Sequence, residues 1–294
     1  MLELSDITVK TERKTWLRDI SLSVEPGLIT GVIGARGSGK TELVRAIMGL
    51  IETDSGTITL EGRELGYGDR QNFGYLPAER GGYPHMKVME QIVYFARLHG
   101  MTLGAAERNA VTLLARLDLS DRAYAPLHNL SGSEVACVEI ASVIAADPDV
   151  VVLDEPFTGL DMKSADLVLS LLRDHAESGV PVIFTSDDWD ETQRYADQIV
   201  VLSHGEIVEH DDVEALRKKG KPTYRAEFVN EKGAKDAEAA LAEIVSGDFV
   251  RKGSIVEFQT SDINRALNAV NGLSGLRNFT TQPANLEELF KERV

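Results

Sequence analysis

A glycine-rich segment near the N-terminus has the residue types that can hold a chain of phosphates. It consists of Gly34, Ala35, Arg36, Gly37, Ser38, Gly39, Lys40 and Thr41, and it matches the P-loop pattern G-x-x-x-x-G-K-[ST]. Glycines let the backbone curl so that amide N–H groups point inward at phosphate oxygens. We expect Lys40 to reach the β- and γ-phosphates and the Thr41 hydroxyl to ligate Mg²⁺. The alternative is a chance glycine-rich turn, but an apolar strand is expected at 29–33 and a helix at 40–50, as the motif requires.

An acidic pair, Asp154 and Glu155, follows the apolar run 150–153. Such a run is typical of a strand buried on both faces. Acidic residues at the carboxyl end of a buried strand lie where open α/β sheets bind ligands. We expect Asp154 to hold Mg²⁺ and Glu155 to act as the general base that polarises an attacking water. Solvated acids at a strand end are the alternative.

The elements that must position these residues alternate along the chain. Strands are expected at 2–9, 17–24, 29–33, 55–60, 73–76, 150–153, 180–185 and 199–202, and helices at 40–50, 88–119, 131–146, 167–177 and 189–196. This alternation predicts an α/β fold with a mostly parallel, helix-covered sheet.

A basic stretch that contains a proline, 217–222, marks an expected domain boundary. The elements beyond it are a strand at 224–229, a helix at 234–245, a hairpin at 249–258, a helix at 263–270, a strand at 276–281 and a helical turn at 286–290. This order predicts a ferredoxin-like α+β domain. We therefore expect one domain at 1–219 and a smaller regulatory or dimerisation domain at 220–294.

The composition of the chain argues against some partners and compartments. The formal net charge is −16 over 294 residues, so we expect no nucleic-acid partner, because phosphate backbones are bound by clustered Lys and Arg. The single cysteine, Cys137, suits a reducing cytosol. We expect neither a signal peptide nor a spanning helix in this sequence. His204 and His210 are expected to be solvated, since no third ligand lies near them at metal-binding spacing.

Four further segments carry a family resemblance over about residues 1–216. Residues 130–134 (LSGSE) resemble the ABC signature L-S-G-G-Q, 158–161 resemble the D-loop, 75–80 the Q-loop, and 183–187 the strand of the switch histidine. With the P-loop and the acidic pair, the chain resembles the ATP-binding subunits of ABC transporters. Ser131 with Glu134 also has the spacing of a capping box, so an ordinary helix start is an alternative for the signature.

The resemblance implies a fold, cofactors and partners. The fold is a P-loop NTPase of ABC type, with a mixed sheet core, an antiparallel β subdomain and a helical subdomain at about 86–146. The cofactors are ATP and Mg²⁺. A second ATP-binding subunit, in a homodimer or heterodimer, would complete each site with its Ser131, Gly132 and Asp161. A transmembrane permease would dock near 79–88, which would place the chain in the cytoplasm, peripheral on the inner face of the membrane. The C-terminal extension is similar to that of some exporters, including sodium-extrusion-like ones.

Several positions depart from the family pattern. The Q-loop glutamine is replaced by Ala78 and the switch histidine by Asp187. The adenine-stacking aromatic falls near Thr11 by spacing, and the nearest aromatic, Trp16, is expected to be a buried strand residue. We therefore expect intact ATP binding and slow hydrolysis in an ATPase subunit of a transporter, an exporter by its resemblance. The alternatives are a non-hydrolysing regulatory subunit and, less favoured by the acidic charge, a soluble ABC protein that acts on nucleic acid.

Overall fold

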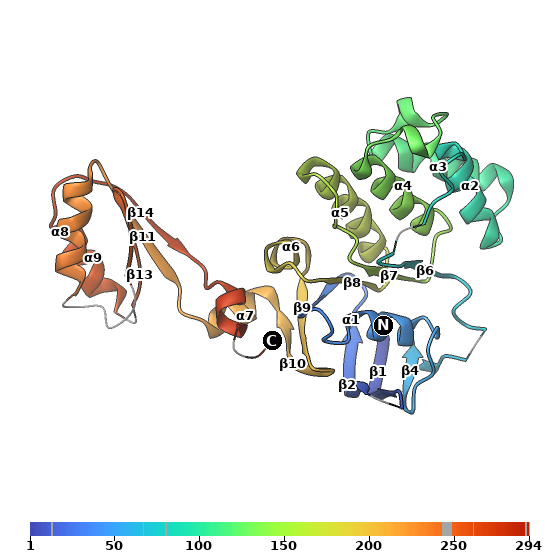
Figure 1. Ribbon diagram of the computed structural model, residues 1–294, viewed down its shortest axis with the longest axis horizontal. Coiled ribbons are helices and arrows are strands. Elements are labelled where there is room, and N and C mark those ends of the chain that lie inside the picture. The colour runs from blue at the N-terminus through green and yellow to red at the C-terminus, as the bar shows by residue number, and fades with distance from the viewer. Residues whose placement is uncertain are drawn as a thin grey trace. The chain divides into compact units, whose positions relative to one another are not determined.

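The computed structural model describes residues 1–294 except 13, 67, 80, 243–248, 261, 292 and 294. The chain forms two compact units, a first unit of residues 1–211 and a second unit of residues 212–292 (Figure 1). Each has its own hydrophobic core. In the part of the chain that the structure describes, no helix is both long and apolar enough to cross a membrane.

A six-stranded sheet forms the centre of the first unit, in the order β10-β9-β3-β8-β7-β6. Its strands are β3 (Ile29–Ile33), β6 (Phe73–Leu76), β7 (Val150–Asp154), β8 (Val182–Ser186), β9 (Gln198–Ser203) and β10 (Glu206–Asp212). The pairs β3–β8, β3–β9, β7–β8 and β6–β7 are parallel. Every residue of β3, β7 and β8 is buried, because layers cover both faces. The predicted parallel sheet is confirmed.

One face of this sheet packs on α1 and on an antiparallel sheet. That second sheet has the order β2-β1-β4-β5, with β1 (Leu2–Lys10), β2 (Thr15–Val24), β4 (Ser55–Leu60) and β5 (Arg63–Glu64), and α1 is Lys40–Ile47. The other face packs on α4 (Gly132–Ile144), α5 (Met162–Glu177) and α6 (Trp189–Tyr195). Figure 1 shows α5 and α4 on the opposite side of the sheet from β1, β2 and β4. This three-layer arrangement is the predicted ABC-type fold.

The region 88–119, which the sequence predicts to be largely helical, consists of two helices. They are α2 (Val88–Leu98) and α3 (Leu103–Arg116). Gly100, with φ of +90°, ends the first helix in the left-handed region that favours glycine, and the Thr102 hydroxyl accepts a hydrogen bond from Ala105 N to begin the second. The helices α2, α3 and α4 lie together (Figure 1).

The second unit has the predicted βαββαβ order. Its elements are β11 (Thr223–Phe228), α8 (Glu231–Ala242), β12 (Phe249–Lys252), β13 (Ile255–Gln259), α9 (Ile263–Asn271), β14 (Leu276–Gln282) and α10 (Leu286–Phe290). The antiparallel sheet has the order β12-β13-β11-β14, and α8 and α9 pack on one of its faces. The last residues of the helix predicted at 234–245 lie outside the described residues.

The two units join at elements that the sequence did not reveal. The strand β10 ends at Asp212, and α7 (Val213–Lys219) follows directly and belongs to the second unit. The units divide between Asp211 and Asp212, whereas the boundary expected from the basic stretch lies after 219. The reason is packing: Leu216 is fully buried, and a Cβ on Gly220 would lie 2.5 Å from the Ala284 Cβ.

Candidate nucleotide-binding site

The P-loop connects β3 to α1, the two elements that the sequence predicts around it. Two of its glycines are required by close backbone contacts. A Cβ on Gly34 would lie 2.2 Å from the Leu202 carbonyl oxygen, and one on Gly39 would lie 2.8 Å from the Trp16 carbonyl oxygen. Gly39 also has φ of +111°, which side chains rarely adopt. Close backbone contacts with β2 and β9 therefore restrict the conformation of the loop.

Lys40 lies at the first position of α1, and its side chain is buried. Its Nζ donates hydrogen bonds to the carbonyl oxygens of Gly34, at 2.6 Å, and Ala35, at 3.5 Å. The same Nζ lies 3.7 Å from Glu155 Oε1. The ammonium group is thus held inside the curve of the P-loop, facing the acidic pair that follows β7.

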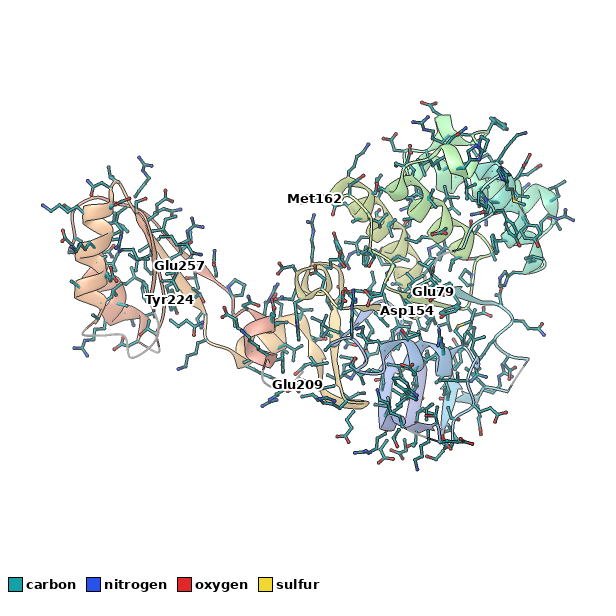
Figure 2. The ribbon with its side chains drawn as sticks, in the orientation of Figure 1. Glu79, Asp154, Met162, Glu209, Tyr224 and Glu257 are labelled. Atoms are coloured by element: carbon teal, nitrogen blue, oxygen red, sulfur yellow. The ribbon has the colours of Figure 1, made fainter. Side chains whose placement is uncertain are left out.

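Asp154 is the last residue of β7, and its side chain lies in the interior of the first unit (Figure 2). Its Oδ1 accepts a hydrogen bond from Thr185 Oγ1 at 2.5 Å. Its Oδ2 is buried and has no hydrogen-bond partner among the described residues. A buried carboxylate oxygen without a partner is costly, so a ligand that binds this oxygen would stabilise the site.

Glu155 follows with a left-handed backbone, φ of +52°, and its N–H donates to Thr185 Oγ1 at 3.1 Å. Burial raises the pKa of its carboxyl, while the nearby charge of Lys40 opposes that shift. The charges of Asp187 and Asp154 raise the same pKa further. A carboxylate with a raised pKa is a better proton acceptor than an ordinary surface glutamate.

These residues surround a cavity of about 580 Å³. Lys40, Thr41, Glu155, Ala78 and Asp187 all line it. The P-loop, Glu155 of the acidic pair, the Q-loop position and the switch position therefore converge in space although they are far apart in the sequence, whereas Asp154 is not among the lining residues. Glu79, which follows Ala78 in the Q-loop segment, is labelled in Figure 2 and is exposed. Arg80, the last residue of that segment, lies outside the described residues.

The signature segment does not line this cavity in the part of the chain that the structure describes. Ser131, Gly132 and Asp161 are absent from its lining among the described residues. Ser131 is the N-cap of α4 and forms the predicted capping box with Glu134: Ser131 Oγ accepts from Glu134 N at 3.2 Å, and Ser131 N donates to Glu134 Oε2 at 2.8 Å. Ser131 and Gly132, at the start of this helix, are exposed.

The signature and the D-loop are joined to each other. Ser133 Oγ accepts a hydrogen bond from Asp161 N at 3.2 Å, and Asp161 Oδ1 accepts one from Ser164 N at 2.8 Å as the N-cap of α5. The Ser164 N–H and then the Ser133 hydroxyl hold the pKa of the Asp161 carboxyl below its ordinary value. The serine that departs from the L-S-G-G-Q pattern thus links the starts of α4 and α5.

Two contacts of the site were not found from the sequence. Arg36 Nε donates to Asp187 Oδ2 at 3.4 Å, across 151 residues. Trp16 is half-buried, and Lys14 Nζ lies 3.6 Å from the centre of its ring and 3.3 Å from the Gly37 carbonyl oxygen. No motif spacing signals the first contact. Lys14 directly precedes β2 and lies two residues before Trp16, which is a weak signal for the second contact, since residues two apart in extended chain share a face.

Comparison with known proteins gives consistent matches. A family model described as ABC transporter matches residues 17–158. An uncharacterized ABC transporter ATP-binding protein of Alkalihalophilus pseudofirmus is 30% identical over 267 residues, which cover 90% of this chain and 98% of that protein. Nod factor export ATP-binding protein I of Burkholderia lata is 29% identical over 282 residues, which cover 94% of this chain and 91% of that protein.

A solved structure of an ATP-binding subunit of an ABC transporter is also similar. Its TM-score is 0.68 at 25% identity, and the match covers 74% of this chain and 92% of that chain. The matched family segment runs from β2 to the D-loop, so it contains the P-loop, the signature and the acidic pair. Sequence, fold and site agree: the chain belongs to the family of ABC transporter ATP-binding proteins, which are ABC-type ATPases.

Proposed function

We propose that this chain binds Mg·ATP in the 580 Å³ cavity and, as one half of an ATP-driven dimer, powers an export transporter. The observation that carries the proposal is the convergence of Lys40, Thr41 and Glu155 on one cavity at the carboxyl ends of β3 and β7. A cation, a hydroxyl and a proton acceptor are the groups that nucleotide hydrolysis needs.

The P-loop supplies the binding of the phosphates. Its amide N–H groups from Gly34 to Thr41, together with the N-terminus of α1, would hold the anion. Lys40 is already directed into the curve of the loop, where it bonds the Gly34 carbonyl and faces Glu155. A polyphosphate is a stronger partner for an ammonium group than a neutral carbonyl, so Lys40 would exchange that bond for phosphate oxygens.

The residues present suit a magnesium ion. Asp154 Oδ2 is buried without a partner among the described residues, and Asp154 directly precedes Glu155, which lines the cavity together with Thr41. Mg²⁺ prefers one or two protein oxygens with the rest supplied by phosphates and water. When bound, the ion would neutralise charge on the phosphates.

Glu155 would accept the proton of the attacking water. Its raised pKa, caused mainly by burial, favours that role. In the family, a glutamine and a histidine assist this step. In this chain their positions are occupied by Ala78, which offers a methyl group, and Asp187, which offers a carboxylate, and both residues line the cavity. We therefore propose that hydrolysis is slow in this subunit.

A second ATP-binding subunit, a copy of this chain or a relative of it, would complete each site. Ser131, Gly132 and Asp161 lie outside the cavity of their own chain but are exposed at two helix N-termini, α4 and α5. Helix N-termini bind phosphate groups, so these residues suit the nucleotide held by the P-loop of a partner.

The surface at 79–88 is the proposed docking site for a transmembrane permease. Tyr83 is 47% exposed, and its ring lies 5.6 Å from that of Tyr94. A cavity of about 410 Å³, lined in part by Pro77, Gly81 and Phe95, adjoins this surface. The chain would then be peripheral on the inner face of the membrane. Export is favoured by the relative named for Nod factor export, which matches both units.

Calorimetric titration of the full chain with Mg·ATP tests the proposal. Lys40→Ala should abolish measurable binding, because the buried cation at the centre of the loop is lost. Lys232→Ala, an exposed lysine on α8, is the matched control and should bind as the unmodified chain does. Equal affinity in the Lys40→Ala chain would contradict the proposed site.

A second candidate function, a non-hydrolysing regulatory subunit, is favoured by Ala78 and Asp187. ATP turnover by the assembled transporter separates the two. If this chain hydrolyses ATP, Glu155→Gln in this chain alone should lower turnover. If turnover is unchanged, the chain is a regulatory subunit.

A further inference from the structure

Two lining residues of the proposed nucleotide cavity, Arg36 and Asp187, form an ion pair. Arg36, in the middle of the P-loop, donates from Nε to Asp187 Oδ2 at 3.4 Å. Both residues line the cavity that also holds Lys40 and Thr41. Asp187 lies at the position where the family resemblance places a histidine that contacts the terminal phosphate. A carboxylate there would repel that phosphate unless another group compensates for its charge.

The other charged groups of the cavity leave Arg36 as the cation that faces Asp187. Lys40 Nζ lies 3.7 Å from Glu155 and bonds P-loop carbonyls. Glu155 already experiences the negative charge of Asp187. Among the described lining residues the acids are Glu42, Glu155 and Asp187, and the bases are Arg36 and Lys40. Arg36 therefore supplies the compensating charge at this edge of the cavity.

We propose that Arg36 compensates for Asp187 and thereby makes this cavity selective for a nucleoside triphosphate over a diphosphate. This inference rests on the proposed function and deepens it. The side chain of Arg36 is 94% exposed and that of Asp187 is 42% exposed, so the guanidinium group has room to turn. A guanidinium has five N–H donors in a plane and can bond a carboxylate and a phosphate together.

The proposal predicts that the effect of removing Asp187 depends on Arg36. Arg36→Ala leaves the carboxylate uncompensated, so ATP affinity should fall by about tenfold or more and ADP affinity by much less, since the charge nearest Asp187 is the terminal phosphate. Asp187→Ala alone should change ATP affinity by about twofold or less, because the freed Arg36 side chain is 94% exposed and solvent screens its charge. In the Arg36→Ala chain, Asp187→Ala should restore most of the lost ATP affinity.

The experiment is a double-mutant cycle on the full chain, with Mg·ATP and Mg·ADP affinities measured by calorimetric titration. Arg36→Lys keeps the positive charge and should keep most of the preference for ATP. The pair Arg63 and Asp69, 2.8 Å apart on the same unit and outside the cavity lining, provides the matched control cycle and should leave both affinities unchanged. Circular dichroism of each variant verifies folding, which substitution of exposed side chains should preserve.

The outcomes are distinct. Restored ATP affinity in the double variant supports the proposal. An unchanged ratio of ATP to ADP affinity in Arg36→Ala, or equal losses with and without Asp187, would overturn the role of Arg36 while the proposed function stands. Failure of the unmodified chain to bind any nucleotide would remove the proposed function, and this inference with it.

Discussion

At the residue scale, Ala78 and Asp187 limit what the cavity can do to a bound nucleotide. Both line it together with Lys40 and Glu155. A methyl group cannot hold a water molecule in line with a phosphate, and a carboxylate cannot donate a hydrogen bond to a phosphate unless it is protonated. On the proposed function, the groups that bind phosphate are present, while the group left to assist hydrolysis is Glu155.

Restoring the two family residues should accelerate hydrolysis. Ala78→Gln combined with Asp187→His adds two groups that can stabilise the transition state, so ATP turnover should rise by about tenfold or more. Release of inorganic phosphate under steady-state conditions measures this. Adding Glu155→Gln to the double variant is the control and should remove the gain. If the unmodified chain is already as fast as the double variant, the explanation from Ala78 and Asp187 is wrong.

Individual site residues differed in how far the sequence could predict them. Lys40 and Glu155 line one cavity, as motif spacing predicted, and Asp154 lies at the end of the buried strand that the apolar run predicted. The ion pair of Arg36 with Asp187 was not found, since the sequence contains no signal for a contact across 151 residues. Trp16 was expected to be buried but is half-exposed beside the P-loop, because β2 is the outermost strand of its sheet.

At the scale of elements, the start of α4 depends on Glu134. This carboxylate accepts from Ser131 N at 2.8 Å and pairs with Arg122 Nε at 3.1 Å. The Ser131 backbone N–H is the main cause that holds the pKa of Glu134 below its ordinary value. The lowered pKa means that the unfolded chain binds this proton more readily than the folded chain does.

Glu134→Gln, which restores the family residue of the signature, should therefore have a pH-dependent effect on stability. Above the ordinary glutamate pKa the variant should be less stable by roughly 0.5–1 kcal/mol, because a charged hydrogen bond becomes a neutral one. The difference should shrink as pH falls through the lowered pKa of the folded state. Urea unfolding at several pH values measures it. If the difference in stability between the two chains stays constant as the pH falls into the acid range, the charged hydrogen bond of Glu134 is not its cause.

Element boundaries were predicted less well than element types. The region 88–119 was predicted to be largely helical, but the break between α2 and α3 was not located. Gly100 adopts a left-handed conformation there, and a hydrophobic pattern alone does not reveal a break with apolar residues on both sides. The strand β10 was missed because its pattern, with acids at Glu206, Glu209 and Asp211, has few apolar positions. The βαββαβ order of the second unit was found because its turns carry glycine and its strands alternate.

At the scale of the whole molecule, each of the two units has a hydrophobic core of its own among the described residues. The core of the second unit consists of residues between Tyr224 and Val270, and none of them belongs to the P-loop or to the strands that hold it. Each core therefore stabilises its own unit.

Phe258→Ala tests this separation. Phe258 is 1% exposed in the second core, so its truncation should lower the stability of that unit by about 3–5 kcal/mol. Affinity for Mg·ATP should remain unchanged. Thermal unfolding followed by circular dichroism, with nucleotide titration alongside, measures both. Val250→Ala, at a residue 45% exposed on the same sheet, is the control and should be nearly neutral. Weakened nucleotide binding in Phe258→Ala would contradict the separation.

The strand order of the six-stranded sheet has a consequence for biosynthesis. The neighbours of β3 are β8 and β9, so the strand that carries the P-loop has no partner in its sheet until the ribosome has translated the chain as far as Ser186, and it lacks its second partner until Ser203. Pairing between such distant segments is slow, and an unpaired apolar strand is prone to aggregate. Nascent chains of the first unit should therefore depend on chaperones during elongation, and messages truncated before Val182 should yield insoluble products. The second unit, whose strands pair within about 60 residues, should mature soon after its own synthesis.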